Sequence, residues 1–168
     1  MYRIADFQKV SEEQFTKDFN NIFKGHSVYG KAANAYNDLI LPKRSTPGSA
    51  GYDFYSPVDF ILKSGETITI PTGIRARIDD GWVLLLAPRS GLGFKYGVRL
   101  TNTLGVIDAD FFQADNEGHI MAKLTCDKNM TVKKGERFMQ GVFVMHGITY
   151  EDEVVECRRT GGMGSTGK

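Results

Sequence analysis

Residues 58–87, VDFILKSGETITIPTGIRARIDDGWVLLLA, contain the pattern that decides the fold. Short runs of β-branched and aromatic residues alternate there with turn residues, such as those at 63–66 and 79–81. Many short strands with turn signals every 8–12 residues or so are typical of a β-sandwich or barrel. This pattern and its continuation predict strands over residues 58–62, 67–70, 74–78, 82–87, 98–101, 120–124, 138–146 and 154–157.

One helix is expected before these strands. Residues 11–14, Ser-Glu-Glu-Gln, have the Ser-x-x-Gln form of a capping box. Phe15, Phe19, Ile22 and Phe23 then recur with helical spacing and form one apolar stripe. The pattern predicts a helix over about residues 11–24 that packs on a sheet and stops near Gly25, followed by a loop over residues 25–37.

The composition restricts the class of protein. The chain has 168 residues, which suits one domain, and 21 Lys+Arg against 20 Asp+Glu give a net charge of +1. No overall basic field favours nucleic acid, and no apolar run approaches the ~20 residues of a spanning helix. Two cysteines, Cys126 and Cys157, exclude a disulfide scaffold and a Cys-rich zinc site, and we expect both to be reduced thiols.

A cytoplasmic protein is therefore expected, because the N-terminus also lacks the apolar region of a secretory signal. Neither a nucleic acid nor a membrane is expected as a partner. No zinc site is predicted either, since His26, His119 and His146 lack the spacing of metal ligands.

Glycine gathers in five segments together with charged or hydroxyl residues: 49–53, 88–93, 102–110, 135–140 and 158–167. Glycine lets backbone N–H groups approach an anion closely, and arginine adds bidentate donors for phosphate oxygens. Carboxylates in the same set suit a divalent cation held between protein and phosphate. The combination indicates a polyphosphate ligand, although any one segment alone could be an ordinary hairpin turn.

Residues 162–168, GMGSTGK, contain the G-x-x-x-x-G-K pattern of a P-loop. That motif also needs a hydroxyl residue after the lysine and a helix whose N-terminus faces the phosphates. Neither follows Lys168, so we do not predict a P-loop NTPase. The same residues could still wrap a phosphate as a flexible C-terminal arm.

In this order, the five segments resemble the five motifs of the trimeric dUTP nucleotidohydrolases (dUTPases), over about residues 39–167. The resemblance implies a homotrimeric β jelly roll with active sites at subunit interfaces. Residues 1–157 would form one β domain with the N-terminal helix, and residues 158–168 an arm that closes an active site. The implied reaction is Mg²⁺-assisted hydrolysis of dUTP to dUMP and pyrophosphate, which keeps uracil out of DNA and supplies dUMP for dTMP synthesis.

The resemblance also implies residue roles. Asp108 would be the general base that activates water, and Asp53 would hold Mg²⁺ through water. Phe111 stands where the family usually has Tyr under the deoxyribose, and Met163 where it usually has Phe stacked on uracil. The other residues implied to bind substrate are Arg89, Ser90, Gly91, Asn102, Gly105, Val106, Ile107, Gln140, Arg158, Gly164, Ser165 and Thr166.

Several alternatives remain open. Asp110 is a second candidate base, ranked lower because an extended backbone would point it away from Asp108. A dCTP deaminase would share the fold, but that family uses Glu near the position of Lys123. A jelly-roll module without activity is opposed by the intact Asp108, Arg89 and Arg158. Two segments longer than the minimal family form, 11–23 and 112–117, are candidate surfaces for a further protein partner, and the host could be a bacterium or a virus.

Overall fold

Antiparallel strands are the main secondary structure of the described chain, which covers residues 2–24 and 30–153 of a computed structural model. The largest sheet has the order β2 (Lys43–Arg44), β3 (Tyr52–Tyr55), β12 (Arg137–Met145), β7 (Trp82–Pro88), β9 (Gly105–Ile107). The second sheet has the order β5 (Thr67–Pro71), β10 (Met121–Thr125), β8 (Arg99–Leu100). Two strand pairs complete the set: β4 (Phe60–Leu62) with β11 (Met130–Val132), and β1 (Ala5–Lys9) with β6 (Ile74–Ile78).

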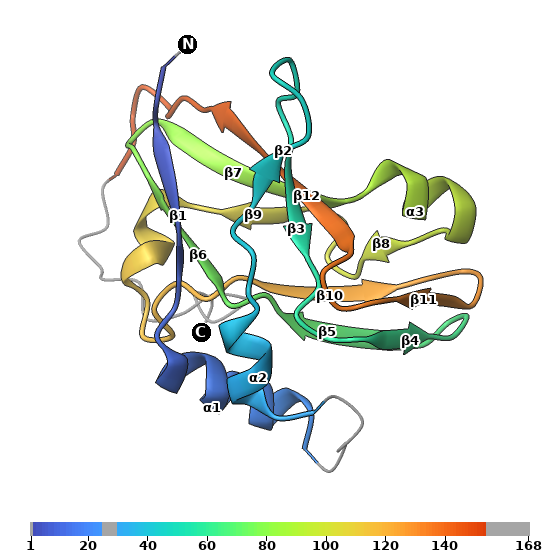
Figure 1. Cartoon of the computed structure of the whole chain (residues 1–168). Helices are drawn as coiled ribbons and strands as arrows, with labels where there is room; N and C mark the ends of the chain where they lie inside the picture. Colours follow the sequence, from blue (N-terminus) through green and yellow to red (C-terminus); the bar gives the residue numbers. More distant parts are fainter. Residues whose placement is uncertain (1, 25–29, 154–168) are drawn as a thin grey trace.

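Two layers enclose the core (Figure 1). Strands β7, β9 and β12 form one layer, β4, β5, β10 and β11 lie below it, and β1 and β6 cross one side. Alternate side chains of both layers point inward, so Leu84 and Leu86 of β7 and Ile70 and Leu124 of the second sheet are at most 2% exposed. The predicted all-β fold is confirmed.

The strong strand patterns are located well by the sequence. Strand β6 has its predicted bounds, and β5, β7, β10 and β12 begin and end within one residue of prediction. Strands β4 and β8 are shorter than predicted, and the strand predicted at 154–157 lies outside the described residues.

Some elements were not predicted. They are β1, β2, β3, β9, β11, the helices α2 (Ala32–Asn37) and α3 (Ser90–Tyr96), and the 3₁₀ helix Ala109–Gln113. The loop predicted over 25–37 is therefore wrong where α2 forms. Strand β9 lies inside the glycine-rich segment 102–110, and β3 begins inside the segment 49–53.

Helix α1 (Glu12–Ile22) begins as predicted but its cap differs in one partner. The Ser11 hydroxyl accepts a hydrogen bond from the Gln14 N–H at 3.1 Å. The reciprocal bond of a capping box does not come from Gln14, whose side-chain amide donates to Asp18. Instead, the Ser11 N–H donates to the carboxylate of Glu117 at 2.7 Å, so a residue 106 positions away completes the cap. Among residues 2–24 and 30–153, no helix has the length and apolar character needed to cross a membrane.

Candidate active site

Three of the five glycine-rich segments meet at one cavity of about 280 Å³. Strand β12 lies between β3 and β7, so Gln140 is paired with Asp53 on one side and with Ala87 on the other. Arg89 follows β7 two residues after Ala87 and therefore reaches the same place. The cavity is lined by Ser45, Ser49, Ala50, Gly51, Asp53, Arg89, Ser90 and Gln140.

The carboxylate of Asp53 lies between two guanidinium groups. Arg89 Nε is 3.4 Å from one carboxylate oxygen, and Arg137 Nη1 is 3.1 Å from the other. The Ser45 hydroxyl donates to the carboxylate as well, and Asp53 is only 7% exposed. One buried carboxylate between two guanidinium groups leaves the cluster of Asp53, Arg89 and Arg137 with a net positive charge, which suits a phosphate group.

Arg137 and Ser45 are site residues that the sequence reasoning did not name. Arg137 lies in the segment 135–140, beside the predicted Gln140, and its charge could have drawn attention to it. Ser45 carries no signal in the sequence, because only the pairing of β2 with β3 brings it to Asp53.

A second cavity, of about 550 Å³, is also lined by Arg89. Its lining includes Gly91 and Lys95 of α3, Tyr55 of β3 and Arg137 of β12. The predicted phosphate contact Gly91 therefore lines this cavity rather than the first, while Arg89 lines both. With a side chain 36% exposed, Arg89 keeps part of its guanidinium open to a ligand.

The segment that carries Asp108 lies elsewhere in the same chain. Strand β9 pairs with β7 so that Leu86 faces Gly105 and Leu84 faces Ile107. Continuing this register puts Asp108 opposite Val83, six residues before Arg89, which corresponds to about 20 Å along a strand. Figure 1 shows the gold turns after Asp108 and the helix α3 after Arg89 at opposite ends of the sheet. A single chain thus does not bring Asp108 to the cavity that Arg89 lines.

Asp108 begins a 3₁₀ helix rather than an extended strand. It is the N-cap of Ala109–Gln113, and its carbonyl accepts a hydrogen bond from the Phe111 N–H at 3.2 Å. The extended backbone used to rank Asp110 below Asp108 is therefore wrong, although Asp108 is half-buried and Asp110 exposed.

Phe111 is 5% exposed and packs in the core, so its predicted role toward a sugar stays a prediction.

The remaining predicted substrate contacts fall into two groups. Asn102 and Val106 are exposed, Ile107 is half-buried and Gly105 is buried, all at the β9 end of the sheet. Gly105 has a structural reason to be glycine, since a Cβ there would lie 2.9 Å from Cβ of Leu86. The predicted residues Arg158, Met163, Gly164, Ser165 and Thr166 lie outside the described residues.

Comparison with known proteins shows the family of this chain. The dUTPase family model matches residues 37–167. The chain belongs to the dUTPase family. It is 41% identical over 148 residues to the deoxyuridine 5'-triphosphate nucleotidohydrolase of Lactococcus lactis subsp. lactis (strain IL1403), covering 86% of this chain and 97% of the relative.

Solved dUTPase structures share the fold. The crystal structure of dUTPase from Streptococcus mutans is 32% identical, with a TM-score of 0.63, and covers 85% of this chain and 97% of that one. A mutant dUTPase from phage phi11 of S. aureus, described with a structural Mg(II) ion, is 18% identical with a TM-score of 0.63 over 92% of this chain and 98% of that one, which shows the fold alone. The predicted dUTPase resemblance and jelly-roll-like architecture are confirmed.

Proposed function

We propose that this dUTPase-family chain hydrolyses dUTP to dUMP and pyrophosphate. The observation that carries the proposal is the cavity in which Asp53, Arg89, Ser90 and Gln140 converge from three of the family's motif segments. The net positive charge of the cluster Asp53, Arg89 and Arg137 suits a triphosphate, and the Lactococcus relative with the corresponding name matches over nearly its whole length. In a cell, this reaction would keep uracil out of DNA and supply dUMP for dTMP synthesis.

The reaction needs water to attack the α-phosphorus in line with the departing pyrophosphate oxygen. Phosphoryl transfer of this kind depends mostly on positioning and on stabilising charge. Arg89 and Gln140 would hold the phosphates, and Asp108 would accept the proton of the attacking water. Arg158, Ser165 and Thr166 of the C-terminal segment would add donors to the phosphates, and Met163 would cover the uracil ring.

A site shared between chains follows from the distance between Asp108 and Arg89. Because one chain keeps them about 20 Å apart along β7, a complete site requires Asp108 from a second chain. The sheet that carries both residues also exposes apolar side chains, including Val106, Val144 and Met145 at 49%, 40% and 68%. Such side chains suit contact with another subunit, in agreement with the homotrimer that the family resemblance implies.

The residues around Asp53 are compatible with Mg²⁺ that arrives on the phosphates. Among residues 2–24 and 30–153, no group of three or more His, Cys, Asp or Glu side chains could hold a metal ion alone. Mg²⁺ is commonly held by one or two carboxylates together with water and substrate phosphates, and Asp53 supplies one carboxylate. When bound there through water, the ion would neutralise charge on the pyrophosphate leaving group.

Pyrophosphate release from dUTP, dCTP, dTTP and UTP, measured side by side, tests the proposal. We expect release from dUTP alone. The Phe111 ring would leave no room for the 2′-hydroxyl of UTP, and Asn102 with the backbone of the hairpin 102–111 would read the uracil edge against dCTP and dTTP. Loss of ammonia from dCTP would instead indicate a deaminase, and equal release from all four nucleotides would contradict selection of uracil and deoxyribose.

A further inference from the structure

Arg75 of β6 contacts the short helix that begins at Asp108. Its Nη2 donates a hydrogen bond to the carbonyl oxygen of Phe112 at 3.3 Å. The guanidinium carbon also lies 3.5 Å from the centroid of the Phe112 ring, a close cation–π contact. Phe112 belongs to the 3₁₀ helix Ala109–Gln113, so Arg75 holds a turn that is covalently continuous with Asp108.

The placement of Arg75 carries an energetic cost. Its side chain is only 19% exposed, and burial lowers the pKa of Arg75 although the charge of Glu117 partly offsets this. In the described part of the chain, Arg75 Nε is the buried side-chain nitrogen or oxygen that lacks a hydrogen-bond partner. A buried charge with an unsatisfied donor is unfavourable, so the contacts with Phe112 and Glu117 offset a real penalty.

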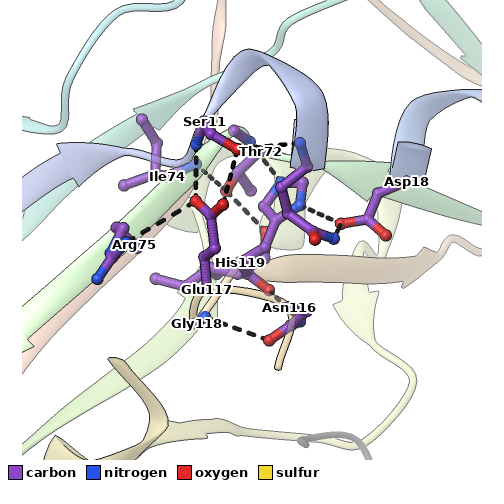
Figure 2. Close-up of polar contacts among 12 residues, drawn as sticks. Ser11, Asp18, Thr72, Ile74, Arg75, Asn116, Glu117, Gly118 and His119 are labelled. Atoms are coloured by element: carbon purple, nitrogen blue, oxygen red, sulfur yellow. Dashed lines mark hydrogen bonds and ion pairs between the residues drawn. The ribbon is translucent and has the colours of Figure 1, made fainter. Parts of the chain in front are cut away.

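Glu117 supplies the opposing charge and links Arg75 to the N-terminal helix (Figure 2). One carboxylate oxygen is 3.8 Å from Arg75 Nη1, and the two oxygens accept bonds from the Ser11 N–H and hydroxyl, each at 2.7 Å. Burial would raise the pKa of Glu117, but the Ser11 hydrogen bonds and the charge of Arg75 outweigh it and lower that pKa. The backbone of Glu117 is left-handed, with φ +58°, which is a strained conformation for a residue with a side chain.

His119 anchors the end of the same segment. Its side chain is fully buried; Nε2 accepts a hydrogen bond from the Gly73 N–H at 2.8 Å, and Nδ1 lies 2.7 Å from the Asp18 carboxylate. Since Nε2 is the acceptor, Nδ1 carries the proton donated to Asp18. Residues 112–119 are therefore fixed to α1 and to the turn before β6. The segments 11–23 and 112–117, both longer than in the minimal family form, thus contact each other.

We infer that Arg75, with Glu117 as its counter-ion, is a positioning residue that sets the place of the Asp108 carboxylate. The inference rests on the proposed hydrolysis, in which Asp108 activates water. Arg75 acts through the Phe112 carbonyl and ring. It does not line the cavity around Asp53 and Arg89 that would hold the phosphates. Loosening the turn after Asp108 should therefore impair the chemical step more than nucleotide affinity because, of the proposed substrate contacts, only Phe111 lies in that turn.

Steady-state kinetics of Arg75→Met test this role. A displacement of about 1 Å can cost a rate factor of about 100, so we expect kcat for dUTP to fall about 10- to 100-fold. KM should rise by a smaller factor than kcat falls, because the proposed phosphate contacts Arg89 and Gln140 are not touched and only Phe111 lies in the loosened turn. Arg75→Lys should restore only part of kcat, since an ammonium group cannot reproduce the planar contact with both Phe112 and Glu117.

Two controls separate positioning from general loss of stability. Arg99→Met removes an exposed arginine that is paired with Asp127 at 2.7 Å and has no contact with the turn after Asp108, so kcat should not change. Leu62→Ala destabilises the core at β4, where Leu62 is 1% exposed, and should keep kcat at temperatures where it remains folded. An equal loss of kcat in Leu62→Ala, or wild-type kcat in a folded Arg75→Met, would overturn the inference.

Glu117→Gln decides the case if Arg75→Met does not fold. It keeps the shape of the side chain but removes the charge facing Arg75, so kcat should fall in the same direction and by a larger factor than KM changes. Unchanged kcat in Glu117→Gln would overturn the positioning role. Failure of the proposed function is distinguishable from failure of the positioning role. If the proposed function is wrong, the wild-type protein has no activity on dUTP. If only the positioning role is wrong, the wild-type protein is active and the folded Arg75 and Glu117 variants keep its kcat.

Discussion

Mixing two inactive variants tests whether Asp108 and Arg89 serve one site from different chains. Asp108→Asn removes the proposed base, and Arg89→Ala removes the guanidinium that lines both cavities. Loss of a general base costs about 10²–10⁴-fold, so each variant alone should be nearly inactive. The two residues lie at opposite ends of β7, about 20 Å apart along the strand, and each substitution should therefore leave the other residue undisturbed.

The expected recovery can be calculated for a trimer. After joint unfolding and refolding at equal amounts, a complete site needs an intact Arg89 from one chain and an intact Asp108 from its neighbour. Each condition is met in half of random cases, so about one quarter of the sites should be complete. If every chain supplied its own site, no site would contain both residues.

Pyrophosphate release from dUTP measures the recovery, and native mass spectrometry verifies that mixed trimers form. A mixture of wild type with Asp108→Asn controls for refolding and should retain about half of the sites, whichever chain supplies the base. Mixed trimers of the two variants with activity no higher than that of either variant alone would refute the shared site, while the family assignment would stand.

Three further predictions concern single residues. Asp108→Asn should abolish turnover and leave the Kd for a non-hydrolysable dUTP analogue nearly unchanged by calorimetry; a greatly weakened Kd would contradict its role as base. Because the stability that comes from the lowered pKa of Glu117 is fully present above the ordinary value of 4.5 and is lost as pH falls through the lowered pKa, the Tm difference between wild type and Glu117→Gln should be largest at neutral pH and vanish below the lowered pKa; a difference independent of pH would contradict this. Gly118→Ala should cost more than about 1 kcal/mol by urea unfolding, because φ is +70° and a Cβ would lie 2.6 Å from the Phe111 carbonyl oxygen, whereas Gly48→Ala, with open space at its Cβ, should cost less; equal losses would contradict the argument.

Strong local patterns made much of the fold predictable. Strand β6 was located to the residue because its apolar positions alternate cleanly between two turns. Three of the five glycine-rich segments form the cavity around Asp53 and Arg89, whereas the segment 102–110 lies elsewhere in the same chain and 158–167 lies outside the described residues. Strands β3 and β9 were missed because the same glycines that mark a binding segment also suppress the signal of a strand.

Contacts between distant residues could not be predicted. The Ser11 cap is completed by Glu117, which no local pattern relates to it. His119 stood out only as a histidine without metal-ligand spacing, and its burial beside Asp18 depends on the docking of α1. Helix α2 is too short, at six residues, to show an apolar stripe.

The long-range cap of α1 bears on how the chain folds as it is synthesised. Glu117 is made 106 residues after Ser11, a delay of roughly 5–20 s at ribosomal rates of about 5–20 residues per second. An isolated helix of 11 residues is marginal in water, and α1 lacks its acidic partner during that interval. The N-terminal segment is therefore expected to dock last, once the strands that present Glu117 and His119 have assembled.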